Sequence, residues 1–291
     1  MSSRTLGILY MLTTVVLWGV SFVATKVLVG IMPPLTAAFL RFVIATAILY
    51  IIVRKPLSYG KKDRIYVILA GLFGITLYFL FENSALRITT ATSGALIVNS
   101  TPVIYLVAAD ILRRKRSPWI RYIGTLLAFI GVSIIVLGGR FVLHLNPLGD
   151  LLMFGAALSW VFYTIFVERV KDYDSLPLTR DISLWGTLFL LPLALLEVSR
   201  TGVFLSAWFT PSAWIALLYL GIFCSALGYL LWNKAISLAG GKTVTSGLYF
   251  IPVVTAIAEA IILKEPIHLY TVVGAILTIG GTYLAEQGGD V

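Results

Sequence analysis

Long stretches without a charged residue constrain this chain most. The run from Thr5 to Thr25 carries no charge over 21 positions, and the run from Ile88 to Ala109 carries none over 22. A helix of about 20 apolar residues can cross the roughly 30 Å hydrocarbon core of a bilayer. Hydrophobic residues make up 59% of the 291 residues and charged residues only 12%. In soluble domains, apolar residues average about 45–50% and charged residues about 25%. The chain is therefore predicted to be an integral membrane protein.

Turn and charge signals divide the chain into ten apolar segments. Because these segments lack the polar alternation of barrel strands, we expect an all-α protein with ten transmembrane helices. The seventh segment is the least secure, because Asp181 and Glu197 leave only 15 uncharged residues between them. The predicted spans are residues 5–26, 34–53, 65–86, 90–111, 119–138, 147–168, 178–198, 213–235, 242–263 and 267–285.

The positive charge of the chain is unevenly distributed. If the amino terminus is placed in the cytoplasm, sixteen Lys and Arg residues fall on the inner side and five on the outer side, while Arg41 lies inside the second span. Cytoplasmic loops of membrane proteins carry such an excess. This explains the net charge of +9 without a nucleic-acid partner. We expect a multi-pass protein of the inner or plasma membrane, in contact with lipid, with both termini in the cytoplasm.

The two halves of the sequence resemble each other. A shift of 142 lays G-I-L-Y-M-L-T-T-V-V-L-W (7–18) on G-D-L-L-M-F-G-A-A-L-S-W (149–160), and a shift of 150 matches Asn83 with Asn233 and Pro102 with Pro252. Such self-similarity indicates a repeated structural unit. It also argues that the first span is a helix and not a cleaved signal peptide. Five spans per unit is an odd number, so the second unit enters the membrane from the opposite side. The sequence therefore predicts a 5+5 inverted repeat, with units at 1–140 and 141–291, as in many secondary transporters.

Three blocks resemble a known family. F-E-N-S-A-L-R-I-T-T-A-T-S-G-A-L-I-V-N-S-T-P-V (81–103), L-G-Y-L-L-W-N-K-A-I-S-L-A-G-G-K-T (227–243) and Y-F-I-P-V-V-T-A-I-A-E-A-I-I-L-K-E-P-I (249–267) are similar to the EamA repeats of the drug/metabolite transporter superfamily. The resemblance implies a ten-helix carrier that exports amino acids or related metabolites, and it leaves the solute open. One departure is that Arg114-Lys115-Arg116 stands where the second half has Lys264-Glu265.

The stretch S-L-A-G-G-K-T-V-T-S (237–246) could suggest a nucleotide site. A phosphate-binding loop needs a glycine five residues before its Gly-Lys-Thr. That position, counted back from Gly241, is Ile236. We therefore expect no nucleotide there; instead, Gly240 and Gly241 end a helix and Lys242 marks the cytoplasmic face.

Two prolines predict where a solute binds. Pro102 and Pro252 lie near the middle of spans four and nine, and each removes a helix hydrogen bond and releases the carbonyl four residues back, at Val98 and Leu248. Irregular backbone in a membrane is tolerated where it is buried in protein or lines a cavity. The alternative is a satisfied kink without a ligand. Asn99 and Tyr249 precede the two prolines by three residues, on the same helical face.

Aromatic residues give a second indication of a pocket. Trp18 and Trp160 lie near the centres of their spans, too deep for the interfacial belt. Tyr78 shares a face of span three with Glu82, and Tyr229 shares a face of span eight with Trp232. These rings either pack or line a wide, lightly polar pocket suited to a solute with an aromatic or aliphatic body.

Charges within the spans are costly and call for a reason. Arg41, Glu82 and Glu259 are candidates for coupling or for an ion pair. In one reading a carboxylate pairs with Arg41 as a fixed brace; in the other, Glu82 binds a proton or the amino group of the solute. Asp110, Glu168 and Glu197 lie near span ends and are expected to be interfacial charges.

Other chemistry is sparse. Cys224 is the only cysteine, and His144 and His268 match no metal-ligand spacing, so we expect neither a cofactor nor a metal. Small residues four apart, Gly124 with Ala128 and Gly274 with Thr278, indicate close helix contacts within the chain or a homodimer seam.

Three functions are compatible with the sequence. The leading one is a carrier that exports a small-molecule substrate by alternating access, with proton coupling as a further expectation. The second is an importer or uncoupled facilitator of similar solutes. The third is a membrane protein that does not transport. An intramembrane enzyme is disfavoured, because no nucleophile with its base is found in the spans.

Overall fold

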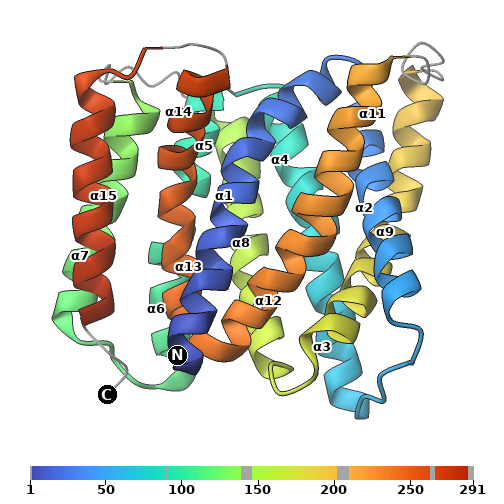
Figure 1. The fold of residues 1–291 in the computed structure, drawn as a ribbon, viewed down its shortest axis with the longest axis horizontal. Coiled ribbons are helices and arrows are strands. Elements are labelled where there is room, and N and C mark those ends of the chain that lie inside the picture. Colours follow the sequence, from blue (N-terminus) through green and yellow to red (C-terminus); the bar gives the residue numbers. More distant parts are fainter. Residues whose placement is uncertain (1, 90, 139–145, 202–209, 263–265, 288–291) are drawn as a thin grey trace.

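The protein is a bundle of roughly parallel helices, seen in a computed structural model that describes residues 2–89, 91–138, 146–201, 210–262 and 266–287 (Figure 1). The helices are α1 (Ser3–Val29), α2 (Pro34–Ile52), α3 (Lys61–Gly71), α4 (Tyr78–Leu86), α5 (Ala91–Val98), α6 (Thr101–Arg113), α7 (Trp119–Val136), α8 (Pro147–Arg169), α9 (Ser175–Thr201), α11 (Pro211–Leu218), α12 (Gly228–Ala239), α13 (Gly241–Ser246), α14 (Phe250–Ile262) and α15 (Leu269–Gln287). Within the described part, nine segments are long and apolar enough to cross a membrane. The remaining predicted span, the ninth (242–263), is assembled from α13, a short 3₁₀ turn and α14.

Four of the ten spans are not regular α-helices. Spans three and eight each contain a π-helical segment, η1 (Leu72–Leu77) and η2 (Tyr219–Leu227). Span four breaks between α5 and α6, and span nine changes to a 3₁₀ turn, η3 (Gly247–Tyr249), before α14. The irregular segments therefore occupy the third and fourth spans of both halves. The pair in spans four and nine was predicted from Pro102 and Pro252, and the π-helical pair in spans three and eight was not. Insertions of this kind in helices often mark functional sites.

The prolines stand at the starts of helices in both breaks. Pro102 occupies the first turn of α6, where its missing N–H has no intrahelical partner to lose. The predicted free carbonyl of Val98 accepts a hydrogen bond from the Thr101 hydroxyl at 2.5 Å. Pro252 lies in the first turn of α14, and the carbonyl of Leu248 accepts a bond from the N–H of the residue that follows η3. The breaks are confirmed, and their carbonyls are satisfied locally.

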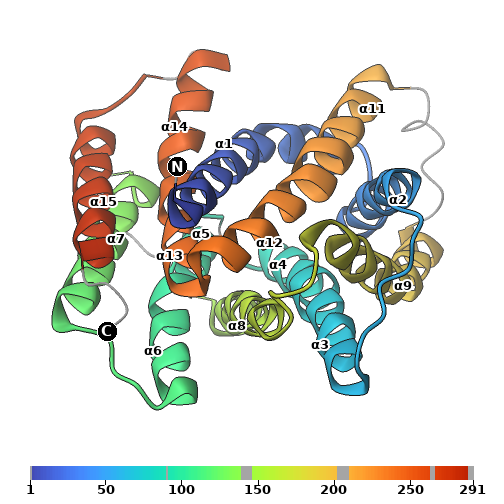
Figure 2. The same ribbon diagram turned by 60° about the horizontal axis from the view of Figure 1, so that its bottom comes forward.

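The two halves pack against each other with the symmetry of an inverted repeat. In the first half α1 packs on α12 and α14 of the second half, while in the second half α8 packs on α3, α4 and α5 of the first. The second helices, α2 and α9, form a pair, and so do the fifth helices, α7 and α15. Figure 2 shows the α7–α15 pair and the α2–α9 pair on opposite flanks of the bundle. The centre between them is left to the first, third and fourth spans of both halves.

Small residues allow α7 and α15 to approach closely. A Cβ added to Gly124 would lie 2.5 Å from the carbonyl oxygen of Gly281, and one added to Gly131 would lie 2.6 Å from that of Gly274. Contacts this short cannot be made by any side chain. Of the two roles predicted for these residues, the structure shows the contact within the chain.

This interface yields a matched pair of substitutions. Gly281→Ala should destabilise the protein by about 1–3 kcal/mol, because its new Cβ would lie 2.3 Å from the Ala128 nitrogen and force the helices apart. Gly280→Ala has nothing within 4 Å of its new Cβ. It should raise stability by up to about 1 kcal/mol through helix propensity. Thermal melting of the purified protein in detergent checks both, and equal melting temperatures would contradict the close contact.

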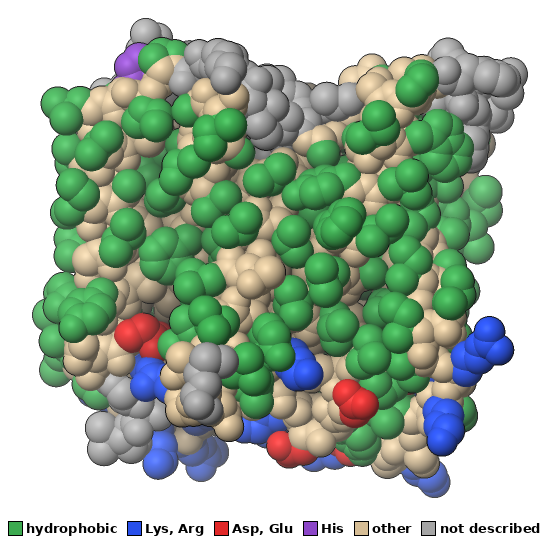
Figure 3. Space-filling view, in the orientation of Figure 1, with side chains coloured by type: hydrophobic (Ala, Val, Ile, Leu, Met, Phe, Trp, Pro, Cys, Tyr) green, Lys and Arg blue, Asp and Glu red, His purple; other side chains and the backbone are tan. Residues whose placement is uncertain are grey.

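Charged side chains gather at one end of the bundle. The connections from α2 to α3, from α6 to α7 and from α8 to α9 lie at the end that also holds both described termini (Figure 1). Figure 3 shows the Lys and Arg side chains of this face gathered at that end, below a surface that is almost wholly hydrophobic. We call it the basic end. The chain therefore has the apolar girdle of a membrane-embedded protein, with its predicted inner loops together on one side.

Candidate functional site

Aromatic rings from both halves meet at the centre of the bundle. Trp18 on α1 contacts Trp160 on α8 with ring centroids 5.4 Å apart, Tyr229 at 5.7 Å and Trp232 at 5.0 Å. Tyr78 on α4 joins the group through Trp160, at 5.4 Å. We call these five residues the aromatic cluster. All five were predicted from sequence as a possible pocket lining, and the structure brings them together.

The rings fill the centre in this conformation. Trp18 is 8% exposed, Trp160 6%, Tyr229 4% and Trp232 0%. At the same time, the indole N–H groups of Trp160 and Trp232 are buried and have no hydrogen-bond partner among the residues that the structure describes. Buried polar groups without partners are uncommon in native structures and call for an explanation. A ligand acceptor that enters when the halves move apart would provide one.

The two π-helical segments hold two further donors of the cluster. A π turn disturbs the regular hydrogen-bond ladder and frees backbone carbonyls. Trp18 Nε1 donates to the carbonyl of Cys224 in η2 at 3.0 Å, and the Tyr229 hydroxyl donates to the carbonyl of Gly74 in η1 at 2.9 Å. Each of these rings is thus anchored to the irregular backbone of the opposite half.

Charged groups lie beside the cluster. The Tyr78 hydroxyl donates to Glu82 Oε1 at 3.0 Å. Arg41, which is 8% exposed, donates from Nε to the Ser225 hydroxyl at 2.8 Å and forms no ion pair with Glu82 or any other described carboxylate. A fixed Arg41–Glu82 brace is therefore not present. The side chain of Glu259, the other predicted partner, lies outside the described residues.

Two predicted lining residues lie apart from the cluster. Tyr249 is fully buried against Ala128 and Val132 of α7, and its hydroxyl has no partner within the ranges that the structure describes. Asn99 uses its side-chain amide to bond the carbonyl of Ala95 at 2.7 Å, which caps the end of α5. The structure places both residues at the helix breaks.

Sequence reasoning missed three residues of this centre. Tyr163 contacts Trp160 at 4.9 Å and donates its hydroxyl to Asn233 at 2.5 Å. Phe42 contacts Tyr229 at 5.4 Å, and Phe79 contacts Tyr78 at 5.3 Å. A signal for Tyr163 was available, because it lies three positions after Trp160 and so shares its helical face. Phe42 and Phe79 carried no such signal.

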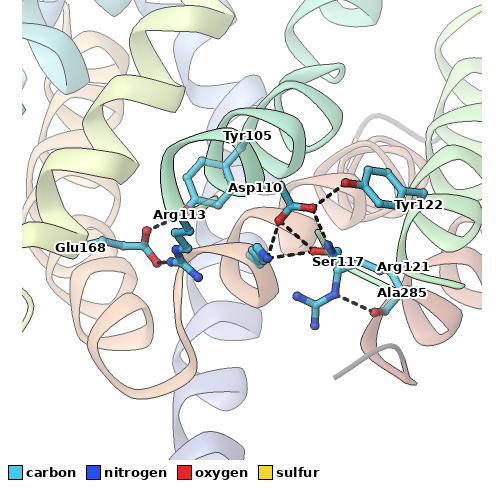
Figure 4. Close-up of polar contacts among 9 residues, drawn as sticks. Tyr105, Asp110, Arg113, Ser117, Arg121, Tyr122, Glu168 and Ala285 are labelled. Atoms are coloured by element: carbon cyan, nitrogen blue, oxygen red, sulfur yellow. Dashed lines mark hydrogen bonds and ion pairs between the residues drawn. The ribbon is translucent and has the colours of Figure 1, made fainter. Parts of the chain in front are cut away.

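A polar network closes the basic end (Figure 4). Lys242 on α13 pairs with Asp110 on α6, with Nζ 2.6 Å from Oδ1. Ser117 and Tyr122 also donate to Asp110, at 2.6 and 2.5 Å. Only 8% of the Lys242 side chain and 6% of the Asp110 side chain are exposed. Lys242 lies at the basic end, where the sequence placed it, and Asp110 lies near the end of its span as predicted, but both side chains are buried in a contact between the halves.

Glu168 forms the second part of this network. It lies at the end of α8 and accepts from the Tyr105 hydroxyl at 2.5 Å, from Arg113 at 2.7 Å and from the backbone N–H of Gly241 at 2.8 Å. A Cβ on Gly241 would overlap the Tyr105 hydroxyl. Gly240, with φ +79°, ends α12 as predicted. The glycines of the G-G-K-T stretch thus serve helix termination and close packing.

The opposite end has a corresponding contact. Glu197 on α9 accepts from Arg87 at 2.8 Å and from the backbone N–H of Thr36, at the start of α2, at 2.8 Å. A carboxylate at a helix amino terminus is favoured by the helix dipole. Glu197 was predicted to be an ordinary interfacial charge, but its side chain is only 4% exposed and bridges the halves.

The fold, the apolar girdle and the central cluster define a membrane carrier built from two inverted five-helix repeats. The chain matches the EamA-like transporter family over residues 5–137 and again over 147–286, so it belongs to that family. It is therefore a multi-pass membrane transporter and not an enzyme.

Relatives span the whole chain. An uncharacterized transporter of Archaeoglobus fulgidus is 31% identical over 277 residues, which cover 93% of this chain and 94% of the relative. A probable amino-acid metabolite efflux pump of Salmonella typhimurium is 27% identical over 300 residues, which cover 98% and 96%. A crystal structure that is 21% identical, with a TM-score of 0.80 over 99% of this chain and 100% of that one, has the same fold.

Proposed function

We propose that this transporter exports small amphipathic metabolites, with amino acids as the first class to test, and that the aromatic cluster binds the solute. The observation that carries the proposal is the cluster itself: five aromatic side chains from both halves, two of which hold indole N–H groups without a partner in the described part of the chain. A largely apolar site with few polar groups suits a solute that has an apolar body. The name of the Salmonella relative supports an amino-acid metabolite.

Alternating access would use the contacts at the two ends of the bundle. The Lys242–Asp110 pair joins the halves at the basic end, and the Arg87–Glu197 pair joins them at the opposite end. We infer that the halves, residues 1–140 and 141–291, rock against each other so that one pair opens while the other stays closed. Pro102 and Pro252, at the breaks of spans four and nine, supply the hinges of this movement.

Glu82 is the proposed coupling residue. It is a carboxylate within a membrane span, beside the cluster and bonded to Tyr78. Ionisable groups at such positions commonly mark proton or substrate pathways. A proton that enters from the outside and displaces the solute from Glu82 would drive export. The basic end faces the cytoplasm in this scheme, in agreement with the positive-inside rule.

Transport by oriented vesicles tests the function. The purified protein is reconstituted into proteoliposomes and sorted by the protease sensitivity of the basic end, and a labelled amino-acid panel is then offered with and without a pH gradient. We expect accumulation in vesicles whose basic end faces outward and whose lumen is acidic. Equal flux in both orientations without a gradient indicates a facilitator, accumulation in the opposite orientation indicates an importer, and no flux of any panel member contradicts the proposed substrate class.

A further inference from the structure

Arg41 is a cation in the middle of a membrane span. It lies well inside α2 (Pro34–Ile52) and is 8% exposed. An ionised group at this depth is strongly disfavoured unless the protein compensates its charge. The charge of Arg41 must therefore be compensated by the groups around it.

That compensation is incomplete. Nε of Arg41 donates to the Ser225 hydroxyl, and the guanidinium lies over the rings of Phe79 and Phe42, 5.1 and 5.5 Å from their centroids. A guanidinium has five N–H donors. Ser225 is its one hydrogen-bond partner among the described residues, so the four N–H groups on the two terminal nitrogens have no acceptor there.

A second buried arginine shows what full compensation looks like here. Arg180 on α9 also lies over a ring, 4.9 Å from the centroid of Tyr50. All three of its side-chain nitrogens are engaged, however: Nε and one terminal nitrogen with Asp181, and the other with the carbonyls of Val53 and Lys55. The chain can therefore satisfy a structural arginine completely, and it does not do so at Arg41.

The scaffold does not require a cation at this position. Pro34-Leu35-Thr36 at the start of α2 matches Pro177-Leu178-Thr179 near the start of α9, which places Leu184 opposite Arg41 in the repeat. The equivalent helix of the second half, α9, thus carries a leucine at this position. The two halves must contact different parts of an asymmetric solute. A charged residue that is present in only one half is therefore a candidate for such a contact.

Arg41 belongs to the same centre as the aromatic cluster. Phe79, over which the guanidinium lies, contacts Tyr78 at 5.3 Å. Tyr78 in turn contacts Trp160 and hydrogen-bonds Glu82. Arg41 and Glu82 thus lie beside the same cluster with different hydrogen-bond partners, Ser225 and Tyr78, and form no ion pair with each other. One face of the centre therefore offers a cation with free donors and a carboxylate that are held apart.

We propose that Arg41 binds the carboxylate of the transported solute. The planar guanidinium fork matches a carboxylate with two parallel hydrogen bonds. Its charge would be compensated when the solute is bound, while Glu82 takes the amino group and the aromatic cluster holds the apolar body. This inference rests on the proposed function and narrows it: the solute is a zwitterion with an apolar body, so solutes without a carboxylate should be transported with a much higher KM.

Matched pairs of solutes test the assignment. Leucine, methionine and phenylalanine are compared with their carboxamides and with phenethylamine in proteoliposomes that hold the wild-type chain. We expect the acids to have a KM about 10- to 100-fold below that of the amides, as for a charged hydrogen bond lost on removal of one partner. Arg41→Gln should raise the KM of the acids to that of the amides and leave the KM of the amides unchanged. Arg41→Lys, which keeps the charge without the fork, should restore part of the preference.

Arg180→Gln is the control, because it removes an equally buried arginine that the structure satisfies internally. It should lower the melting temperature without changing the ratio of acid to amide. The inference is overturned if wild-type protein transports amides or phenethylamine as well as the acids, or if Arg41→Gln weakens both members of each pair equally. In both cases transport itself, and with it the proposed function, still stands. Absence of flux for all these solutes contradicts both.

Discussion

Glu82→Gln is expected to abolish solute accumulation driven by a pH gradient while the protein still inserts and purifies. Glutamine keeps the shape of the side chain and a carbonyl acceptor for the Tyr78 hydroxyl, which donates to Oε1 at 3.0 Å, but it cannot release or take up a proton. If the carboxylate carries the coupling proton, flux in the variant becomes independent of pH. Accumulation in proteoliposomes at several external pH values measures this directly.

A carboxylate outside the membrane centre provides the control for that experiment. Glu286 pairs with Arg4 at the basic end, where the Arg4 side chain is 51% exposed. Glu286→Gln should leave both accumulation and its pH dependence unchanged, because exposed ion pairs contribute little. If Glu82→Gln retains the wild-type pH profile, Glu82 has no coupling role, and proton coupling must use another group or be absent.

Trp160→Ala is expected to produce the largest loss of solute affinity. Trp160 contacts Trp18, Tyr78, Tyr229 and Trp232, so it touches every other member of the aromatic cluster. Its removal takes away a stacking face and a free indole N–H, and we expect KM to rise at least about tenfold. It also leaves a cavity that costs about 3–5 kcal/mol of stability.

The two effects can be separated by a second variant. Trp160→Phe keeps most of the ring volume and loses the N–H, so it should recover most of the stability and only part of the affinity. Trp119, which is 81% exposed, serves as the matched control, and Trp119→Ala should change neither quantity strongly. Stabilisation of each variant by added solute, measured as a shift in melting temperature, distinguishes binding from packing. An unchanged shift in a destabilised Trp160→Ala variant would assign Trp160 to packing alone.

Segment positions were predictable because bilayer thickness and charge act locally along the chain. The seventh predicted span, 178–198, lies wholly within α9, although Asp181 and Glu197 made it the least secure. Both charges find partners near the ends of that helix, in Arg180 and Arg87. The paired prolines likewise predicted the irregular segments of spans four and nine. Such inferences need only the sequence of one segment, or a comparison of two.

Contacts between distant segments were harder to predict. Trp18 and Trp232 meet because α1 of one half packs on α12 of the other, and no local pattern encodes that crossing. The burial of Asp110 was missed for the same reason, since its partner Lys242 is 132 positions away in the sequence. Tyr249 was expected beside the solute because of its proline, but the rotation of the helix turns it toward α7.

The reciprocal anchoring of Trp18 and Tyr229 has a mechanical consequence. Trp18, from the first half, is bonded to η2 of the second, and Tyr229, from the second half, is bonded to η1 of the first. When one half moves relative to the other, the bonded ring must therefore move with the π-helical segment that holds it, or both hydrogen bonds must break. If the aromatic cluster binds the solute as proposed, contact with the solute is coupled to the movement of the halves. Tyr229→Phe, which removes one of the two hydrogen bonds, should then uncouple them and allow leakage.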